Sequence, residues 1–264
     1  MPIPVAFSPC PNDTFLFHAW VHGLLDSKCT PSLHDIEKLN QLALHRRFPL
    51  IKVSFGCLPL LLENYAMLPV GAALGYACGP LIVAREPFDL DELPSKRIAI
   101  PGEHTTAHLL LKTLAPEPKE KQFCLYHEII DLLHAGAVDA SLLIHEQRFT
   151  HPFTQIADLG ALWEEQFALP IPLGCLVADK TLGREQVEQL TKTLQASLQH
   201  AWDHPEASAD YVREHAQDKD PDVIRKHIDT YVTQETLNLS ATGRQAVDHL
   251  LNHAQHPDHL CPSP

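Results

Sequence analysis

A histidine that directly follows an apolar run has the position and the chemistry of a general base. His145 comes after Leu142-Leu143-Ile144, a run that predicts a buried strand, so its side chain is expected at the carboxyl end of that strand. Imidazole is the side chain best matched to proton transfer near neutral pH. The adjacent Glu146 would raise the basicity of His145 if it packed nearby, although neighbours along a strand point to opposite faces. This position makes His145 a candidate proton acceptor of a catalytic site.

A polar, proline-stiffened turn follows another short apolar run near the N-terminus. Ile3–Phe7 predicts a buried strand, and residues 8–14 (SPCPNDT) lead from it into a helix. Open α/β sheets bind ligands at such strand ends, whereas Asn, Asp and Thr also cap the free N–H groups of a helix start. We expect Ser8, Asn12 and Thr14 to contact a substrate or to cap this helix.

Cys10 lies inside the same turn and supports a rival hypothesis. A thiol near a helix N-terminus can be acidified into a nucleophile. No histidine is adjacent to Cys10 in the sequence, and the flanking Pro9 and Pro11 favour a packed structural role.

Two more strand ends carry polar side chains. Lys52 and Ser54 close the run Leu50–Ser54, where Ser54 can donate a hydrogen bond and Lys52 can supply a positive charge, unless it is an ordinary solvent-facing lysine. Thr105 and Thr106 follow the strand-like run at 97–100 and start a helical pattern. Their hydroxyls and the free N–H groups of that helix can hold a carboxylate, and the simpler interpretation is a threonine N-cap.

The elements that position these residues alternate between strand-like and helical patterns, which is typical of an α/β fold. A first group covers residues 3–84 and a second covers residues 97–144. The apolar pattern lapses between them, around residues 86–94. A further strand is predicted at Leu173–Ala178, and helical patterns fill residues 184–253.

These patterns predict two α/β lobes with a ligand cleft between them. The first and larger lobe would contain residues 1–88 and 179–264, including the C-terminal helices, and the second would contain residues 89–178. Such an arrangement resembles the type II periplasmic-binding-protein architecture, in which the ligand binds between the lobes.

Five segments in sequence order resemble the 1,4-dihydroxy-6-naphthoate synthase family, which acts in the futalosine route to menaquinone. They are SPCPNDTF at residues 8–15, KVS at 52–54, PGEHTTA at 101–107, IHE at 144–146 followed by RFT, and LPIPLG at 169–174. Because the segments span most of the chain, the resemblance is more specific than any one short motif.

The resemblance implies a carbon–carbon lyase that converts cyclic de-hypoxanthine futalosine to 1,4-dihydroxy-6-naphthoate without a metal or a redox cofactor. In the family the histidine of the IHE segment, here His145, is the proposed base. The family's substrate contacts carry over to Lys52, Val53, Ser54, Thr105, Thr106 and Ala107.

Two alternative functions fit the same fold. One is a non-catalytic binding protein for a small anionic solute, but residues 1–13 lack the basic and apolar regions of its usual export signal. The other is the related chorismate dehydratase of the same pathway, against which the combined SPCPNDT and IHE segments argue.

Composition limits the partners and the compartment. The 33 acidic and 20 basic residues give a formal charge of −13, which argues against a nucleic-acid or anionic-membrane surface. No apolar run is long enough for a membrane span, and the 7 cysteines lack Cys-x-x-Cys spacing, as expected for reduced thiols in a cytoplasm. Neither a nucleotide-binding glycine motif nor a convincing metal constellation occurs, since the pair His18 and His22 lacks the glutamate of HExxH. We expect a cytoplasmic enzyme that binds a small-molecule substrate and neither nucleic acid nor a membrane.

Overall fold

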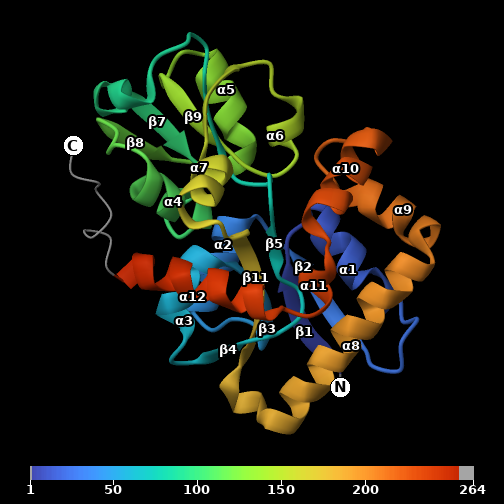
Figure 1. The fold of residues 1–264 in the computed structure, drawn as a ribbon. Coiled ribbons are helices and arrows are strands. Elements are labelled where there is room, and N and C mark those ends of the chain that lie inside the picture. Colours follow the sequence, from blue (N-terminus) through green and yellow to red (C-terminus); the bar gives the residue numbers. More distant parts are fainter. Residues whose placement is uncertain (1, 256–264) are drawn as a thin grey trace.

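The computed structural model describes residues 2–255 and shows two α/β lobes, one above the other in Figure 1. Each lobe is built around one mixed sheet. This is the two-lobed α/β architecture expected from the sequence. Among the described residues, no helix is both long enough and apolar enough to cross a lipid bilayer.

The first sheet has the strand order β2-β1-β3-β11-β4, with β5 also paired to β11. Its strands are β1 (Ile3–Phe7), β2 (Cys29–Leu33), β3 (Leu50–Ser54), β4 (Tyr65–Met67), β5 (Ala73–Gly75) and β11 (Ile171–Asp179). Strand β1 runs parallel to β2 and β3, whereas β11 runs antiparallel to β3, β4 and β5.

The second sheet has the order β10-β6-β9-β7-β8. Its strands are β6 (Leu81–Ala84), β7 (Arg97–Ile100), β8 (Glu120–Phe123), β9 (Ala140–Leu143) and β10 (Thr154–Asp158). Strand β7 is parallel to β8 and β9, and β6 is antiparallel to β9 and β10.

The helices divide unequally between the lobes (Figure 1). The first lobe holds α1 (Pro11–Val21), α2 (Ile36–Leu44), α3 (Leu58–Leu61), α8 (Arg184–Asp203), α9 (Pro205–His215), α10 (Pro221–Tyr231), α11 (Gln234–Leu237) and α12 (Ala241–Gln255). The second lobe holds α4 (Thr106–Leu114), α5 (Ile129–His134), α6 (Gln147–Thr150) and α7 (Leu159–Phe167). Short 3-10 turns occupy Phe55–Cys57, Leu90–Ser95, Tyr126–Glu128 and Lys180–Leu182.

Alternate residues of the first sheet point to its two opposite faces, where they pack into two separate apolar layers. Val5 and Phe7 pack with α1 and α8, whereas Ala6 packs in the layer that contains α2 and reaches the second lobe. Helix α1 is buried on all sides because the sheet lies on one side of it and α8, α9 and α10 on the other (Figure 1). The rings of Phe7 and Phe17 stack with centroids 4.1 Å apart.

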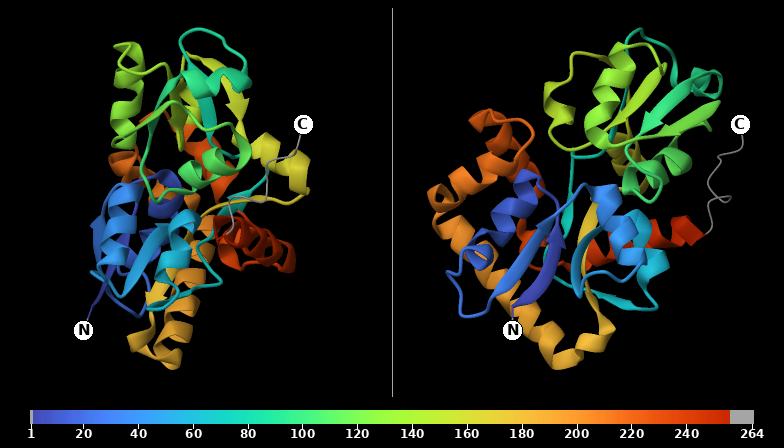
Figure 2. Two further views of the ribbon diagram at one scale, coloured as in Figure 1. Left: turned by 90° about the vertical axis from the view of Figure 1, so that its left-hand side faces the viewer. Right: turned by 180° about the vertical axis from the view of Figure 1, so that it is seen from behind.

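The chain crosses between the lobes through residues 76–80 and 159–170, and the views in Figure 2 show both sheets with these connections. The crossings touch through their backbones: a Cβ atom on Gly79 would lie 2.3 Å from the Cα of Gly160. Leu159 N also donates to the Pro80 carbonyl at 2.9 Å. Two glycines are therefore required where the crossings meet.

These crossings correct the lobe boundaries expected at 88/89 and 178/179. Strand β6 pairs with β9 and β10 in the second sheet, and β11 pairs with β3 in the first sheet. The lapse in apolar pattern around residues 86–94 is a loop and a 3-10 turn within the second lobe. An apolar strand fits either sheet equally well, so the pattern alone did not determine which one it joins.

Candidate active site

A cavity lies between the lobes, and both lobes contribute polar and apolar side chains to its lining. Most of its polar side chains follow the carboxyl ends of β1, β3, β7 and β9, where open sheets place their ligands. The site residues expected from the sequence that line it are Ser8, Asn12, Lys52, Ser54, Thr105, Thr106, Ala107 and His145. The rest of the lining is Asp13, Ile36, Ala73, Cys78, Gly79, Pro80, Ile144, Leu173, Gly174 and Tyr231.

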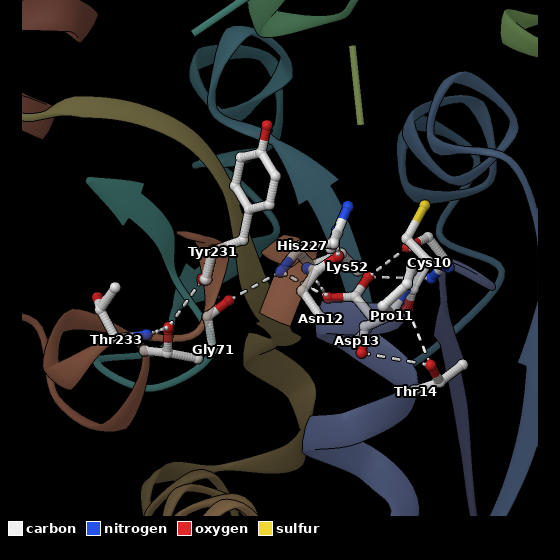
Figure 3. Close-up of polar contacts among 12 residues, drawn as sticks. Cys10, Pro11, Asn12, Asp13, Thr14, Lys52, Gly71, His227, Tyr231 and Thr233 are labelled. Atoms are coloured by element: carbon white, nitrogen blue, oxygen red, sulfur yellow. Dashed lines mark hydrogen bonds and ion pairs between the residues drawn. The ribbon is translucent and has the colours of Figure 1, made fainter. Parts of the chain in front are cut away.

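Asp13 and Lys52 form a buried ion pair at one wall of this cavity (Figure 3). Lys52 Nζ lies 2.8 Å from Asp13 Oδ1, and the two side chains are 5% and 1% exposed. Nζ also donates to the Gly71 carbonyl at 2.9 Å, which leaves one of the three ammonium protons without an acceptor among residues 2–255. Lys52 is therefore paired rather than solvent-facing, and it keeps one donor for an anionic ligand group.

The hydroxyl of Ser8 belongs to the same network. Ser8 Oγ and Ser8 N donate to Asp13 Oδ2 at 2.7 and 3.1 Å. Asn12 Nδ2 donates to Asp13 Oδ1 at 2.9 Å. Both side chains line the cavity. The hydroxyl hydrogen of Ser8 and one amide hydrogen of Asn12 are used to hold the carboxylate of Asp13.

The hydroxyl of Ser54 is oriented by Asn40, a fully buried residue of α2. Asn40 Nδ2 donates to Ser54 Oγ at 3.0 Å, and Asn40 Oδ1 accepts from Ser54 N at 2.9 Å. Since Ser54 Oγ accepts the amide hydrogen, its own hydrogen is free to donate to a ligand in the cavity.

The start of α4 offers a ligand its backbone rather than its side chains. Thr105 Oγ1 accepts from His108 N at 3.2 Å and donates to the Gly102 carbonyl at 2.9 Å, so this hydroxyl is the helix cap. The N–H groups of Thr106 and Ala107 belong to the first helical turn and have no intrahelical acceptor. Two adjacent N–H groups at a helix N-terminus suit a carboxylate.

Thr106 connects the lobes through its hydroxyl. Thr106 Oγ1 accepts from Gly56 N at 3.0 Å and donates to the Leu173 carbonyl at 2.6 Å, both on the first-lobe side. Glu37 of α2 makes a second bridge, in which its carboxylate accepts from His104 N at 3.0 Å and contacts His104 Nδ1 at 2.8 Å. The cleft is therefore held by hydrogen bonds on the α4 side.

Thr106→Val is expected to loosen this side of the cleft. Valine has the shape of threonine but leaves the Gly56 N–H and the Leu173 carbonyl unpaired, which costs about 1–3 kcal/mol of unfolding free energy. Urea unfolding and the KM for substrate measure the effect, and KM should rise more than kcat falls. Thr113→Val is the matched control, because the Thr113 hydroxyl bonds only the Leu109 carbonyl of its own helix. Equal stability of the two variants would contradict the bridge.

His145 follows β9 in a left-handed backbone conformation, with φ of 54°. This region is uncommon for a residue other than glycine, and such strain is found at functional sites. Neither ring nitrogen has a hydrogen-bond partner in the described part of the chain, and the ring packs edge-on to Tyr126 with centroids 5.3 Å apart. Burial lowers the pKa of His145 to about 4, against an opposing effect of the Asp13 carboxylate. The imidazole is therefore neutral at pH 7 and able to accept a proton.

Cys10 is buried at the start of α1 and does not line the cavity. Burial and the nearby Glu146 raise the pKa of its thiol well above the usual value. A protonated thiol is a poor nucleophile, so the structural role is favoured over the catalytic one.

Cys10→Ser is accordingly expected to fold and to keep most of the activity. Serine is similar to cysteine in size and polarity, and the sulfur atom of Cys10 takes no part in the proton transfer expected of His145. Activity assays combined with labelling by a substrate-like electrophile measure this. Complete loss of turnover in a folded variant, with labelling of Cys10 in the parent, would revive the thiol mechanism.

Cys10, His145 and Glu146 present one ligand atom each within 4.8 Å of one another. A metal ion binds cysteine and glutamate in their ionised forms. Burial raises the pKa of the Cys10 thiol well above its usual value and that of the Glu146 carboxyl to about 7, so both groups favour the neutral form. The spacing alone does not make this cluster a metal centre.

Dialysis against EDTA is therefore expected to leave the turnover rate unchanged. The measurement compares kcat before and after chelation, with metal content followed by atomic emission. A loss of activity that a divalent ion restores would contradict catalysis without a metal. It would point to a metal site at Cys10, His145 and Glu146.

Two expected contacts lie outside the cavity lining. Val53 is fully buried on the face of β3 opposite to Lys52 and Ser54, because successive residues of a strand point to opposite faces. Thr14 Oγ1 donates to the Cys10 carbonyl at 3.0 Å within the first turn of α1. Tyr231 of α10 also lines the cavity. It lies far along the chain from the other site residues, and no local sequence pattern predicted it.

Two α/β lobes joined by two crossings, with a cavity between the lobes, define the periplasmic-binding-protein class of fold. The alkanesulfonate-binding protein SsuA from Xanthomonas axonopodis pv. citri has this fold, with a TM-score of 0.66 and 16% identity over 99% of this chain and 94% of that chain. The crystal structure of a protein from Archaeoglobus fulgidus is more similar, with a TM-score of 0.91 and 31% identity over 97% of each chain.

Proteins related in sequence define the family of this chain more narrowly than the fold does. A relative from Thermus thermophilus, named 1,4-dihydroxy-6-naphtoate synthase, is 42% identical over 98% of this chain and 96% of its own length. A relative of the same name from Streptomyces coelicolor is 41% identical over 96% of this chain and 92% of its own length. The menaquinone biosynthesis family model matches residues 3–256, and the chain belongs to this family. The family expected from the five sequence segments is confirmed.

Proposed function

We propose that the protein is a carbon–carbon lyase that converts cyclic de-hypoxanthine futalosine to 1,4-dihydroxy-6-naphthoate, with His145 as the proton acceptor. The observation that carries this proposal is the position of His145. It is a neutral imidazole with unpaired nitrogens, in a cavity that also contains donors for an anionic substrate. Two relatives that match nearly the whole chain are named for this product.

The residues divide the work in a way that suits this chemistry. His145 removes a proton to start carbon–carbon bond cleavage. Formation of the aromatic ring then makes the overall reaction favourable. The free hydrogen of Ser54, the remaining proton of Lys52 and the N–H groups of Thr106 and Ala107 would hold the polar groups of the substrate. We place this activity in the cytoplasm, where unpaired buried cysteines such as Cys10 stay reduced.

The test is to give purified protein cyclic de-hypoxanthine futalosine and to follow the naphthoate by absorbance and mass. Chorismate, offered in parallel, tests the dehydratase alternative, and calorimetry with both compounds tests binding without turnover. Formation of the naphthoate is the expected result. Tight binding without product, or turnover of chorismate alone, would overturn the proposal.

A further inference from the structure

Glu146 and His227 are two buried titratable residues that the proposed chemistry does not use. They are 2% and 0% exposed. Both carboxylate oxygens of Glu146 and the Nδ1 atom of His227 lack a hydrogen-bond partner among residues 2–255. Glu146 Oε2 and His227 Nδ1 lie 3.9 Å apart. A buried polar atom without a partner costs free energy. A hydrogen bond between Glu146 Oε2 and His227 Nδ1 would give each of these two atoms a partner.

The tautomer of His227 follows from its other hydrogen bond (Figure 3). The Asp13 carboxylate accepts hydrogen bonds from Ser8 and pairs with Lys52, so the amide group of Asn12 must turn its Nδ2 toward Asp13. Asn12 Oδ1 then faces His227 Nε2 at 3.0 Å and accepts its hydrogen. A neutral His227 with hydrogen on Nε2 has a lone pair on Nδ1. That lone pair faces Glu146, and it needs a donor.

The two residues come from opposite sides of the cleft. Glu146 follows His145 directly at the start of α6 in the second lobe, and His227 lies on α10 in the first lobe. The rings of His145 and His227 are nearly parallel, with centroids 6.2 Å apart. Phe149 of α6 also packs against His227, with centroids 6.5 Å apart, so α6 and α10 meet here (Figure 1).

We propose that Glu146, as a neutral acid, donates a hydrogen bond to Nδ1 of His227 when the lobes close on substrate, and that this bond fixes the turn carrying His145. Both are positioning residues, and the inference deepens the proposed function, on which it rests. The separation of 3.9 Å is about 1 Å longer than a hydrogen bond, so a small closing movement forms it. His145 needs such support because its left-handed turn is held by no hydrogen bond of its own ring.

The surroundings favour one shared proton rather than an ion pair. Burial raises the pKa of Glu146 to about 7 against the lowering effect of the backbone N–H groups of Glu146 and Gln217, and Asp218 adds a smaller increase. Burial lowers the pKa of His227 well below its usual value. Glu146 also borders an open hollow that contains Gln217, which gives its proton a route to solvent. The titratable and charged groups around the pair are Cys10, Asp13, Tyr126, His145, Asp218, Lys219 and Tyr231, whose ring centroid lies 4.5 Å from that of His227.

The pair predicts a loss of activity on the alkaline side. As pH rises through about 7, Glu146 ionises and two hydrogen-bond acceptors face each other, so the bond across the cleft is lost. The limb of kcat/KM on this side should therefore follow Glu146, whereas the acid limb follows His145.

Variants of Glu146 test the pair through its pH profile. Glu146→Gln keeps an N–H donor for His227 Nδ1 but cannot ionise, so it should stay close to the parent at pH 7 and lose the alkaline limb. Glu146→Ala removes the donor and should lower kcat/KM by about 100-fold, the scale of a misplaced catalytic group. Glu165→Gln is the control, because Glu165 is an exposed carboxylate of α7. A Gln variant as impaired as the Ala variant, or one that keeps the alkaline limb, would overturn the proposal.

Infrared difference spectroscopy tests the proton without any turnover. The C=O stretch of a protonated carboxyl should be present in the parent below pH 7, disappear as pH rises through about 7, and be absent in Glu146→Gln. If the protein binds no futalosine derivative but shows this band, the proposed function fails, whereas the neutral Glu146 carboxyl that the pair requires is supported. If the protein makes the naphthoate and the band is missing, the pair is wrong and the function stands.

Discussion

His145→Asn should lower kcat by about two to four orders of magnitude, the usual scale for loss of a general base. Asparagine keeps a polar group of similar reach but cannot take the substrate proton. The donors of Ser54, Lys52 and α4 are untouched, so the substrate dissociation constant should change little. Steady-state kinetics give kcat, and calorimetry with the inactive variant gives the dissociation constant. His134→Asn, on the exposed face of α5, is the control.

The acid limb of the pH profile supplies an independent check on His145. Burial lowers its pKa to about 4, so the imidazole is neutral and active above that pH. A protonated ring cannot accept a proton, and the rate should therefore fall as pH drops through about 4. Near-normal turnover by His145→Asn would refute the assignment, and an acid limb near the ordinary histidine pKa would mean that the ring is more solvated than its burial implies.

The sequence predicted the strands that carry the site and missed two strands that lie at sheet edges. Strands β1, β3 and β7 begin and end where the apolar runs do. Strand β2 (CTPSL) and strand β10 (TQIAD) are edge strands with exposed polar residues, so they lack the continuous apolar signal of an interior strand. Helix α3 ends at Leu61, because Tyr65 begins β4 soon after it and pairs with Asp179.

The site itself was predictable where chemistry follows a strand and unpredictable where it depends on tertiary contact. His145, Ser54 and Thr106 stand directly after or at the end of apolar strands, which is a local pattern. Asn40 and His227 are polar residues inside helices, and a solvent-facing side chain there would look the same in the sequence. Only the packing of α2 and α10 against the cleft turns these two side chains inward.

Asp13→Asn should destabilise the fold by about 3–5 kcal/mol, the cost of leaving a buried charge without its partner. The substitution removes the anion that Lys52 Nζ meets at 2.8 Å and leaves the ammonium with the Gly71 carbonyl alone. Lys52→Met should cost less, because Asp13 keeps the two donors of Ser8 and the amide of Asn12.

Combining the two substitutions tests whether the loss of unfolding free energy comes from the Asp13–Lys52 ion pair or from either residue alone. In Asp13→Asn/Lys52→Met no buried charge is left unpaired, so the double variant should be more stable than Asp13→Asn by itself. Urea unfolding of the four proteins gives the coupling free energy directly. Lys52→Met should also weaken substrate binding in either background, because it removes the one ammonium proton that the protein does not use. Strictly additive losses in the cycle would mean that Asp13 and Lys52 are stabilised independently, and the wall of the cavity would then need another explanation.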